Sequence, residues 1–173
     1  EVRAGSWSIV LENVGTDTAE FHGWIERDDA GSSQFSHADN YPRFTISSLA
    51  CGQNTIVVGS YDATAGNLAI STFSAEGPTR DRRRKPEVSA PGESVFAARS
   101  LTQTTMAKSG TSMAAPHVTG LIALLMQVKS QPLTIDEIRN AVLRFARRNP
   151  PEGNEWQSRY GAGRIDVVTS IRS

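Results

Sequence analysis

The sequence predicts an α/β fold in which parallel strands pack against a buried helix, preceded by a β-rich segment. Residues 55–61 contain a β-branched run bounded by Gly52 and Gly59, which is typical of a strand buried in a parallel sheet. Apolar residues from Val118 to Met126 surround their helix instead of forming one stripe, which predicts a helix buried inside the protein. Near the start of the chain, apolar and polar residues alternate, which indicates strands.

The composition is that of a globular domain with one core, and it argues against several classes of partner. The 173 residues are 38% hydrophobic and 21% charged, which is ordinary for a globular chain. The 18 basic and 18 acidic residues balance, so we expect neither nucleic acid nor an anionic membrane surface as a partner. The longest apolar run, residues 121–126, is much too short to span a bilayer.

Cys51 and Glu1 bear on the kind of chain this is. Cys51 is the only cysteine, so no intrachain disulfide forms, and we expect a small buried apolar side chain rather than a catalytic thiol. Glu1 opens the chain without a methionine and without a basic-then-apolar leader. We therefore expect a fragment of a longer protein.

The first 25 residues carry two apolar clusters on either side of a polar, turn-like stretch. The alternation predicts two strands joined by a loop, with the aromatic side chains in a core; the apolar residues are Trp7, Ile9, Leu11, Phe21, Trp24 and Ile25. His22 and His37 suggest a catalytic triad, because a His, Asp, Ser order is one known solution. Lone histidines in polar loops are usually solvated, and we expect that here.

Short strands and polar loops fill the middle of the chain. Residues 69–73 and 87–90 are strand candidates, and 95–98 and 104–106 lead to a serine-rich turn. The basic run at residues 80–85 is interrupted by Asp81, so we expect a solvated loop and not a nucleic-acid patch. The acidic residues lack the spacing of calcium ligands, so the sequence indicates no metal site and no cofactor.

Two helices are expected near the end of the chain. Pro132, Thr134 and Glu137 have the spacing of a capping box, which predicts a helix start. One apolar stripe follows, made of Ile138, Val142, Leu143 and Phe145, and residues 150–153 are expected to end the helix. A glycine-rich turn at residues 161–163 leads into a last short helix.

Ser112 is the candidate catalytic residue. Small residues on both sides leave its side chain uncrowded, and Pro116 is expected near the first turn of the helix. Ser112 therefore lies at a helix N-terminus, where unpaired N–H groups and the helix dipole favour negative charge. An ordinary N-cap serine is the alternative. His117 lies about 140° around the helix from Ser112, so we expect it to bond locally and not to act as the base.

Residues 110–118, GTSMAAPHV, resemble the nucleophile signature of the subtilisin-like serine peptidases, or subtilases. Residues 73–79, 85–92 and 161–168 are similar to three further landmarks of that family, in the right order. The resemblance covers residues 44–173. It implies the carboxyl half of a subtilisin-like parallel-sheet domain that cleaves polypeptides without a cofactor.

The resemblance also implies a role for individual residues. Ser112 is expected to be the nucleophile, with its backbone N–H in the oxyanion hole. Gly110 and Thr111 are expected to line the substrate site, and alignment places Ser47 near the floor of the specificity pocket.

The family's aspartate, histidine and oxyanion asparagine precede these landmarks, and nothing in residues 1–55 matches them. Residues 1–43 would then be the tail of an inserted β-rich domain. We expect the 173 residues alone to be inactive, and to need the N-terminal part of the same protein as a partner. Half a parallel sheet has a bare edge, so self-association or segment swapping is expected. The resemblance suggests a secreted or extracytoplasmic protein.

Two other functions are alternatives to a subtilase. An α/β-hydrolase usually has glycine two residues after its serine and a histidine further on, whereas this chain has Ala114 and only the badly placed His117. The second alternative is a catalytically inactive interaction module with a subtilase-like fold.

Overall fold

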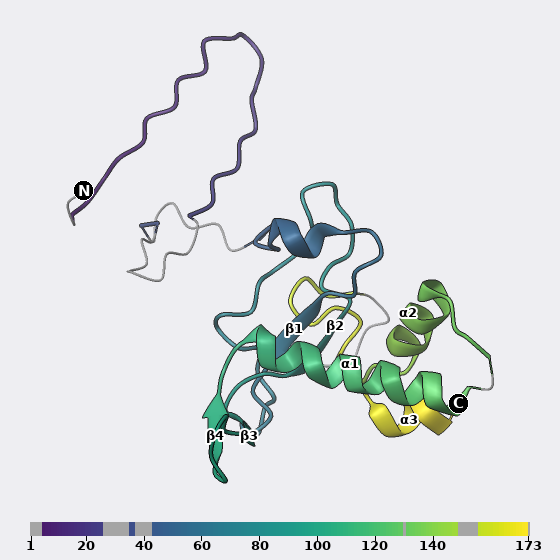
Figure 1. Ribbon diagram of the computed structural model, residues 1–173. Helices are drawn as coiled ribbons and strands as arrows, with labels where there is room; N and C mark the ends of the chain where they lie inside the picture. Colours follow the sequence, from purple (N-terminus) through teal and green to yellow (C-terminus); the bar gives the residue numbers. More distant parts are fainter. Residues whose placement is uncertain (1–4, 26–34, 37–42, 130, 149–155, 173) are drawn as a thin grey trace. The chain divides into compact units, whose positions relative to one another are not determined.

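The computed structural model describes residues 5–25, 35–36, 43–129, 131–148 and 156–172 (Figure 1). The chain divides into two units. The first unit is Glu1–Asn40 and the second is Tyr41–Ser173.

The described part of the first unit has neither strand nor helix. Trp7 and Phe21 are 72% and 71% exposed, and Trp24 is 55% exposed. The prediction of two strands with their aromatics in a core is therefore wrong for residues 5–25. Alternation favours extended backbone, but a stable strand needs a hydrogen-bonding partner, and no strand pairing joins these residues to another described segment.

The second unit is built on two parallel strands, as predicted. β1 (Val58–Tyr61) pairs with β2 (Val88–Pro91) in a register that joins Val58 to Val88 and Tyr61 to Pro91. The helix α1 (Thr111–Val128) packs against both strands (Figure 1). Its buried residues and those of β2 form the core, with Val142 added from the next helix. The predicted α/β architecture is confirmed.

Helix α1 buries one stripe and exposes the other side. Ala114, Val118, Leu121 and Leu125 are buried, at spacings of four, three and four residues. Three apolar residues on other faces are 40–54% exposed, namely Leu124, Met126 and Val128. The prediction of a helix buried all round is therefore wrong within the described chain, because the sheet covers one face only. Length and composition alone would let α1 cross a membrane, but a core helix passes the same test.

Helix α2 (Ile135–Arg144) begins as predicted. The Glu137 N–H donates to Thr134 Oγ1 at 3.3 Å, and the Thr134 N–H donates to Glu137 Oε2 at 2.8 Å. Ile138 and Val142 are buried. The helix ends at Arg144, earlier than expected, and the predicted stop at residues 150–153 lies outside the described residues. A last helix, α3 (Val167–Arg172), follows the glycine-rich turn as predicted.

The other short strands are only partly as expected. β3 (Val95–Ala98) and β4 (Thr105–Lys108) form an antiparallel hairpin. Residues 69–73 contribute a single bridge, between Ile70 and Tyr61, in place of the predicted strand. A 3-10 helix, η1 (Ser48–Cys51), precedes β1. Cys51 is half-buried, less than expected, with its Sγ 3.9 Å from the Ile46 carbonyl oxygen.

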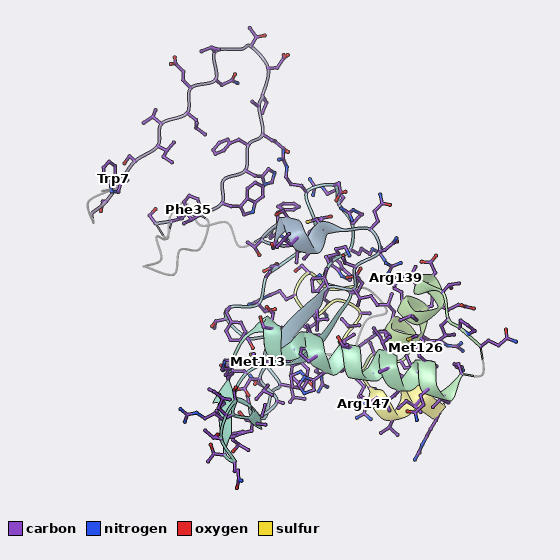
Figure 2. The ribbon with its side chains drawn as sticks, viewed as in Figure 1. Trp7, Phe35, Met113, Met126, Arg139 and Arg147 are labelled. Carbon is purple, nitrogen blue, oxygen red and sulfur yellow. The ribbon has the colours of Figure 1, made fainter. Side chains whose placement is uncertain are left out.

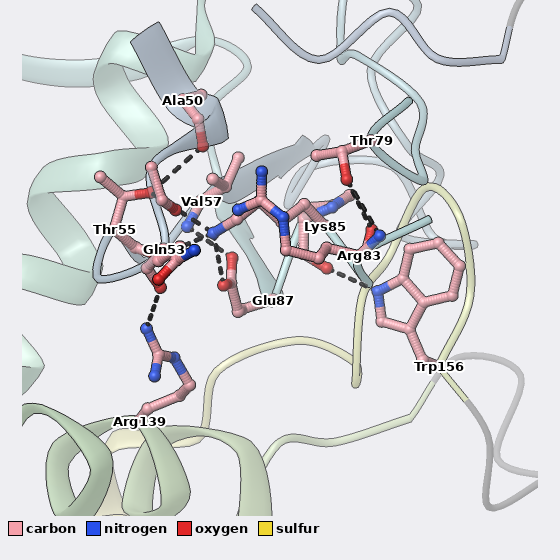
Figure 3. Close-up of polar contacts among 12 residues, drawn as sticks. Ala50, Gln53, Thr55, Val57, Thr79, Arg83, Lys85, Glu87, Arg139 and Trp156 are labelled. Atoms are coloured by element: carbon pink, nitrogen blue, oxygen red, sulfur yellow. Dashed lines mark hydrogen bonds and ion pairs between the residues drawn. The ribbon is translucent and has the colours of Figure 1, made fainter. Parts of the chain in front are cut away.

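Lys85 is not part of a solvated loop, which corrects the prediction for the end of the basic run. Its side chain is 3% exposed and its Nζ lies 2.7 Å from Glu87 Oε1. The same Nζ donates to the Thr55 carbonyl oxygen at 2.8 Å, and Glu87 Oε2 accepts the Val57 N–H at 2.7 Å (Figure 3). The pair therefore ties the segment before β1 to the segment before β2.

Two further bonds flank this ion pair in Figure 3. Arg139 of α2 donates to the Gln53 carbonyl oxygen at 2.8 Å, and the Trp156 indole N–H donates to the Pro86 carbonyl oxygen at 2.7 Å. Burial of a paired, fully bonded charge is tolerated where a lone one is not.

Candidate active site

Ser112 is the second residue of α1 and is exposed. Gly110 is the N-cap, with φ 153° and ψ 156°, a conformation that a residue with a side chain rarely adopts. Met113 marks this end of the helix, next to the β3–β4 hairpin, and Met126 lies near the other end (Figure 2). The predicted position of Ser112 at a helix N-terminus thus agrees with the structure.

Two hydrogen bonds fix the turn that precedes Ser112. The Gly110 N–H donates to the Gly92 carbonyl oxygen at 2.7 Å, and the Ser94 N–H donates to Ser109 Oγ at 2.9 Å. Gly92 and Ser94 follow the carboxyl end of β2, the end at which open α/β sheets place their ligands. The segments on both sides of the hairpin are therefore held together at the serine.

The backbone around Ser112 can stabilise an anion. The first N–H groups of a helix lack intrahelical partners and carry the positive end of the dipole. The Met113 N–H turns back to the Gly110 carbonyl oxygen at 2.9 Å. The first turn of α1 contains no acidic residue. Backbone N–H groups beside a hydroxyl at this place can donate hydrogen bonds to a substrate oxygen that becomes negatively charged.

His117 bonds locally, as predicted. Its Nδ1 lies 2.9 Å from the Met113 carbonyl oxygen. Within the described residues no hydrogen bond reaches the Ser112 hydroxyl, so no base is in contact with it there. Pro116 was expected near the first turn of the helix, and it lies just beyond that turn, five residues after Thr111 and inside α1. Its missing N–H leaves the Ser112 carbonyl without the usual helix donor.

The structure brings three of the four predicted site residues together. Gly110 and Thr111 precede Ser112 directly and are half-buried. Ser47 lies elsewhere in the chain, as the N-cap of η1, and it is exposed. Its carbonyl oxygen accepts the Ala50 N–H at 2.9 Å. His22 stacks on Trp24, with ring centroids 5.6 Å apart, and His37 lies outside the described residues. In the part of the chain described, no cluster of three metal-ligating side chains occurs.

Sequence reasoning missed the group of residues behind the serine turn. A Cβ on Gly92 would lie 2.3 Å from Ser60 Oγ and 2.8 Å from the Gly110 carbonyl oxygen. Ser60 Oγ in turn lies 2.9 Å from Ser71 Oγ, and both side chains are buried. The Pro91-Gly92 turn was visible in the sequence, but no local pattern links it to serines twenty or more residues away.

Comparison with known proteins gives one consistent family. Residues 28–163 match the model of the Subtilase family. The chain is 32% identical over 168 residues to Subtilisin DY of Bacillus licheniformis, which covers 96% of this chain and 53% of that protein. It is 28% identical over 148 residues to Serine protease AprX of Bacillus subtilis (strain 168), covering 73% of this chain and 32% of the relative.

Solved structures similar to this chain include subtilisin-like proteases. The CspB protease of Clostridium perfringens has a TM-score of 0.66 and 29% identity, over 75% of this chain and 29% of that one. The chain thus spans between about a third and a half of the length of these proteins. The family match begins at residue 28, before the boundary at residue 44 that the motifs suggested.

Proposed function

The chain belongs to the subtilase family of serine proteases, and on that premise we propose that it supplies the nucleophile of a serine endopeptidase. One observation carries the proposal: Ser112 is exposed at the N-terminus of the helix that packs on the parallel strands. Its turn has the GTSMAAPHV sequence, and Gly110 has the backbone conformation that this turn needs.

The proposed reaction is acyl transfer from a polypeptide. Ser112 Oγ attacks the peptide carbonyl carbon while a histidine takes the hydroxyl proton, and an aspartate orients that histidine. The Ser112 N–H binds the oxyanion of the tetrahedral intermediate. Gly110 and Thr111 contact the substrate beside the scissile bond, and Ser47 contributes to the specificity pocket.

The histidine, the aspartate and the oxyanion asparagine would come from an N-terminal part of the same protein, which we propose as the partner of these residues. Residues 1–43 would be the tail of an inserted domain, without the strands expected in residues 5–25, and residues 44–173 the carboxyl part of the catalytic domain. The 173 residues alone are then inactive. Loss of one oxyanion-hole donor, measured in subtilisin, lowers turnover about 10²–10³-fold, and an unassisted serine hydroxyl is a weak nucleophile.

Turnover of an unfolded polypeptide substrate tests the proposal. The whole protein should cleave it, and Ser112→Ala should abolish cleavage. Ser100→Ala, an exposed serine at the hairpin tip, is the matched control and should keep the wild-type rate. The purified 173-residue chain should show no cleavage.

Each contrary result has a distinct meaning. Cleavage that survives Ser112→Ala in the whole protein would remove Ser112 as nucleophile. Serine-dependent cleavage by the 173 residues alone would refute their inactivity. A whole protein that is folded and never cleaves would favour the interaction module.

A further inference from the structure

Gly92 lies between a pair of buried hydroxyls and the serine turn. It is buried, and its N–H donates to the Tyr61 carbonyl oxygen at 3.1 Å. Its own carbonyl oxygen accepts the Gly110 N–H at 2.7 Å. One residue therefore links the end of β1 to the N-cap of the helix that carries Ser112.

The space around Gly92 is too small for any side chain. A Cβ there would lie 2.3 Å from Ser60 Oγ, 2.8 Å from the Gly110 carbonyl oxygen and 3.0 Å from Ala114 Cβ. Gly92 is not among the described residues with positive φ, so its backbone would accept alanine. Glycine is required here only because a Cβ would clash with its neighbours. Of the three neighbouring atoms, one belongs to Gly110 in the serine turn and one to Ala114 in the first turn of α1.

Ser60 forms the opposite wall. Its side chain is 0% exposed, and Ser71, 2% exposed, holds the Ser60 hydroxyl at 2.9 Å. The Ser60 N–H donates to Ser74 Oγ at 3.0 Å, and the Ser71 N–H donates to the Ser60 carbonyl oxygen at 2.9 Å. The Ser60 hydroxyl therefore has a fixed position against Gly92.

We propose that Gly92, with the Ser60–Ser71 hydroxyl pair behind it, is a positioning element for the nucleophile. Resting on the proposed function, this assigns these residues to the reaction although none touches the substrate. Ser60 limits how far the Gly92 backbone can move away from the serine turn. Gly92 in turn fixes Gly110, because its carbonyl oxygen accepts the Gly110 N–H at 2.7 Å. The peptide groups of Thr111 and Ser112 follow from the placement of Gly110. A misplacement of about 1 Å at a reacting group lowers rate on the order of 10²-fold.

The test is inactivation of the whole protein by a peptidyl fluorophosphonate, with the maximal rate constant and the inhibitor half-saturation measured separately. Gly92→Ala should lower the maximal rate constant on the order of 10²-fold, and Ser60→Ala roughly tenfold. Half-saturation should stay within about twofold in both, because the contacts that bind the inhibitor are unchanged.

Ser89→Ala is the matched control. Ser89 is 0% exposed, lies on β2 next to Gly59, and bonds to the Gly163 carbonyl oxygen at 3.3 Å, away from Gly92. It should lower the melting temperature about as much as Ser60→Ala while leaving the inactivation rate near wild type. If Gly92→Ala does not fold, the comparison of the inactivation rates of Ser60→Ala and Ser89→Ala tests the proposal.

Equal loss of rate in Ser60→Ala and Ser89→Ala, or no loss in Ser60→Ala, would overturn the positioning role. Labelling that persists in Ser112→Ala would instead remove the proposed function itself.

Discussion

Gly110 holds the backbone at φ 153° directly before the helix that carries Ser112. Glycine reaches this region without contact between Cβ and the backbone, whereas other residues are strained there. The N–H and carbonyl groups of Gly110 are both used, one by Gly92 and the other by Met113. The backbone conformation of one residue therefore determines how the serine is presented.

Alanine at Gly110 should destabilise the chain by about 1–3 kcal/mol, the strain of a non-glycine residue in this conformation. Gly120→Ala is the matched change within the same helix, at a position where a Cβ meets nothing within 4 Å. It should stabilise by up to about 1 kcal/mol, because alanine favours helix over glycine. Urea unfolding of the three chains measures both. Effects of the same sign would contradict this account of Gly110.

Lys85 and Glu87 form a buried ion pair. Among the described residues, Lys85 Nζ also donates to the carbonyl and hydroxyl oxygens of Thr55, and Glu87 accepts the Val57 N–H. Lys85→Met should destabilise by about 3–5 kcal/mol, because it leaves a carboxylate buried without its counter-charge. The double change Lys85→Met with Glu87→Gln should be less damaging, since Gln still accepts the Val57 N–H without a charge. Unfolding by urea gives both values.

Asp136→Asn is the control for this pair. It breaks an ion pair with Arg139 in which the aspartate side chain is 79% exposed, and exposed pairs contribute about 1 kcal/mol or less. A loss as large as that of Lys85→Met would contradict the importance of burial.

These residues also show how far sequence reasoning reaches. Ser112 and Gly110 belong to one continuous motif, so their positions follow from local sequence. Lys85, in contrast, looked like the end of an exposed basic run, and its partner Thr55 lies thirty residues earlier. Only the pairing of β1 with β2 brings them together, and no local pattern encodes it.

At the scale of elements, helix starts were predictable and strand partners were not. The capping box of α2 lies within four residues, so the sequence contains all of it. Residues 5–25 have the alternation of strands but no described partner. The all-round apolar surface of α1 indicated burial on every side, yet the described chain supplies a sheet on one side only.

Helix α3 should lose stability in acid through Asp166. Three hydrogen bonds to the Asp166 carboxylate lower its pKa to about 2. They come from the Thr169 backbone N–H, from Arg147 Nε, which lies 2.5 Å from Asp166 Oδ2, and from the Thr169 hydroxyl. A depressed folded-state pKa gives stability that is present above the unfolded value of about 4 and is lost as pH falls through about 2. Asp166→Asn should therefore reduce the pH dependence of unfolding free energy between pH 4 and 2. An unchanged slope in the variant would contradict this assignment.

At the scale of the whole molecule, the apolar side chains exposed near the end of α1 should make the 173-residue chain self-associate. Met126 and Val128 are each 54% exposed and Leu124 is 40% exposed, on different faces of the helix, and burial of exposed apolar surface drives association. Met126→Lys should shift sedimentation toward monomer, whereas Gln127→Lys, the neighbouring exposed residue, should change it less. A compact wild-type monomer, or equal effects of the two lysines, would count against this expectation.

The central claim is that Ser112 is the nucleophile of a subtilase, and the site of a covalent label tests it most directly. The whole protein is treated with a fluorophosphonate and digested, and the modified residue is located by mass spectrometry. The account predicts one phosphonate per molecule, on Ser112, and none on the 173 residues alone. A folded whole protein that takes up no label, or that carries it on another residue, would contradict the claim.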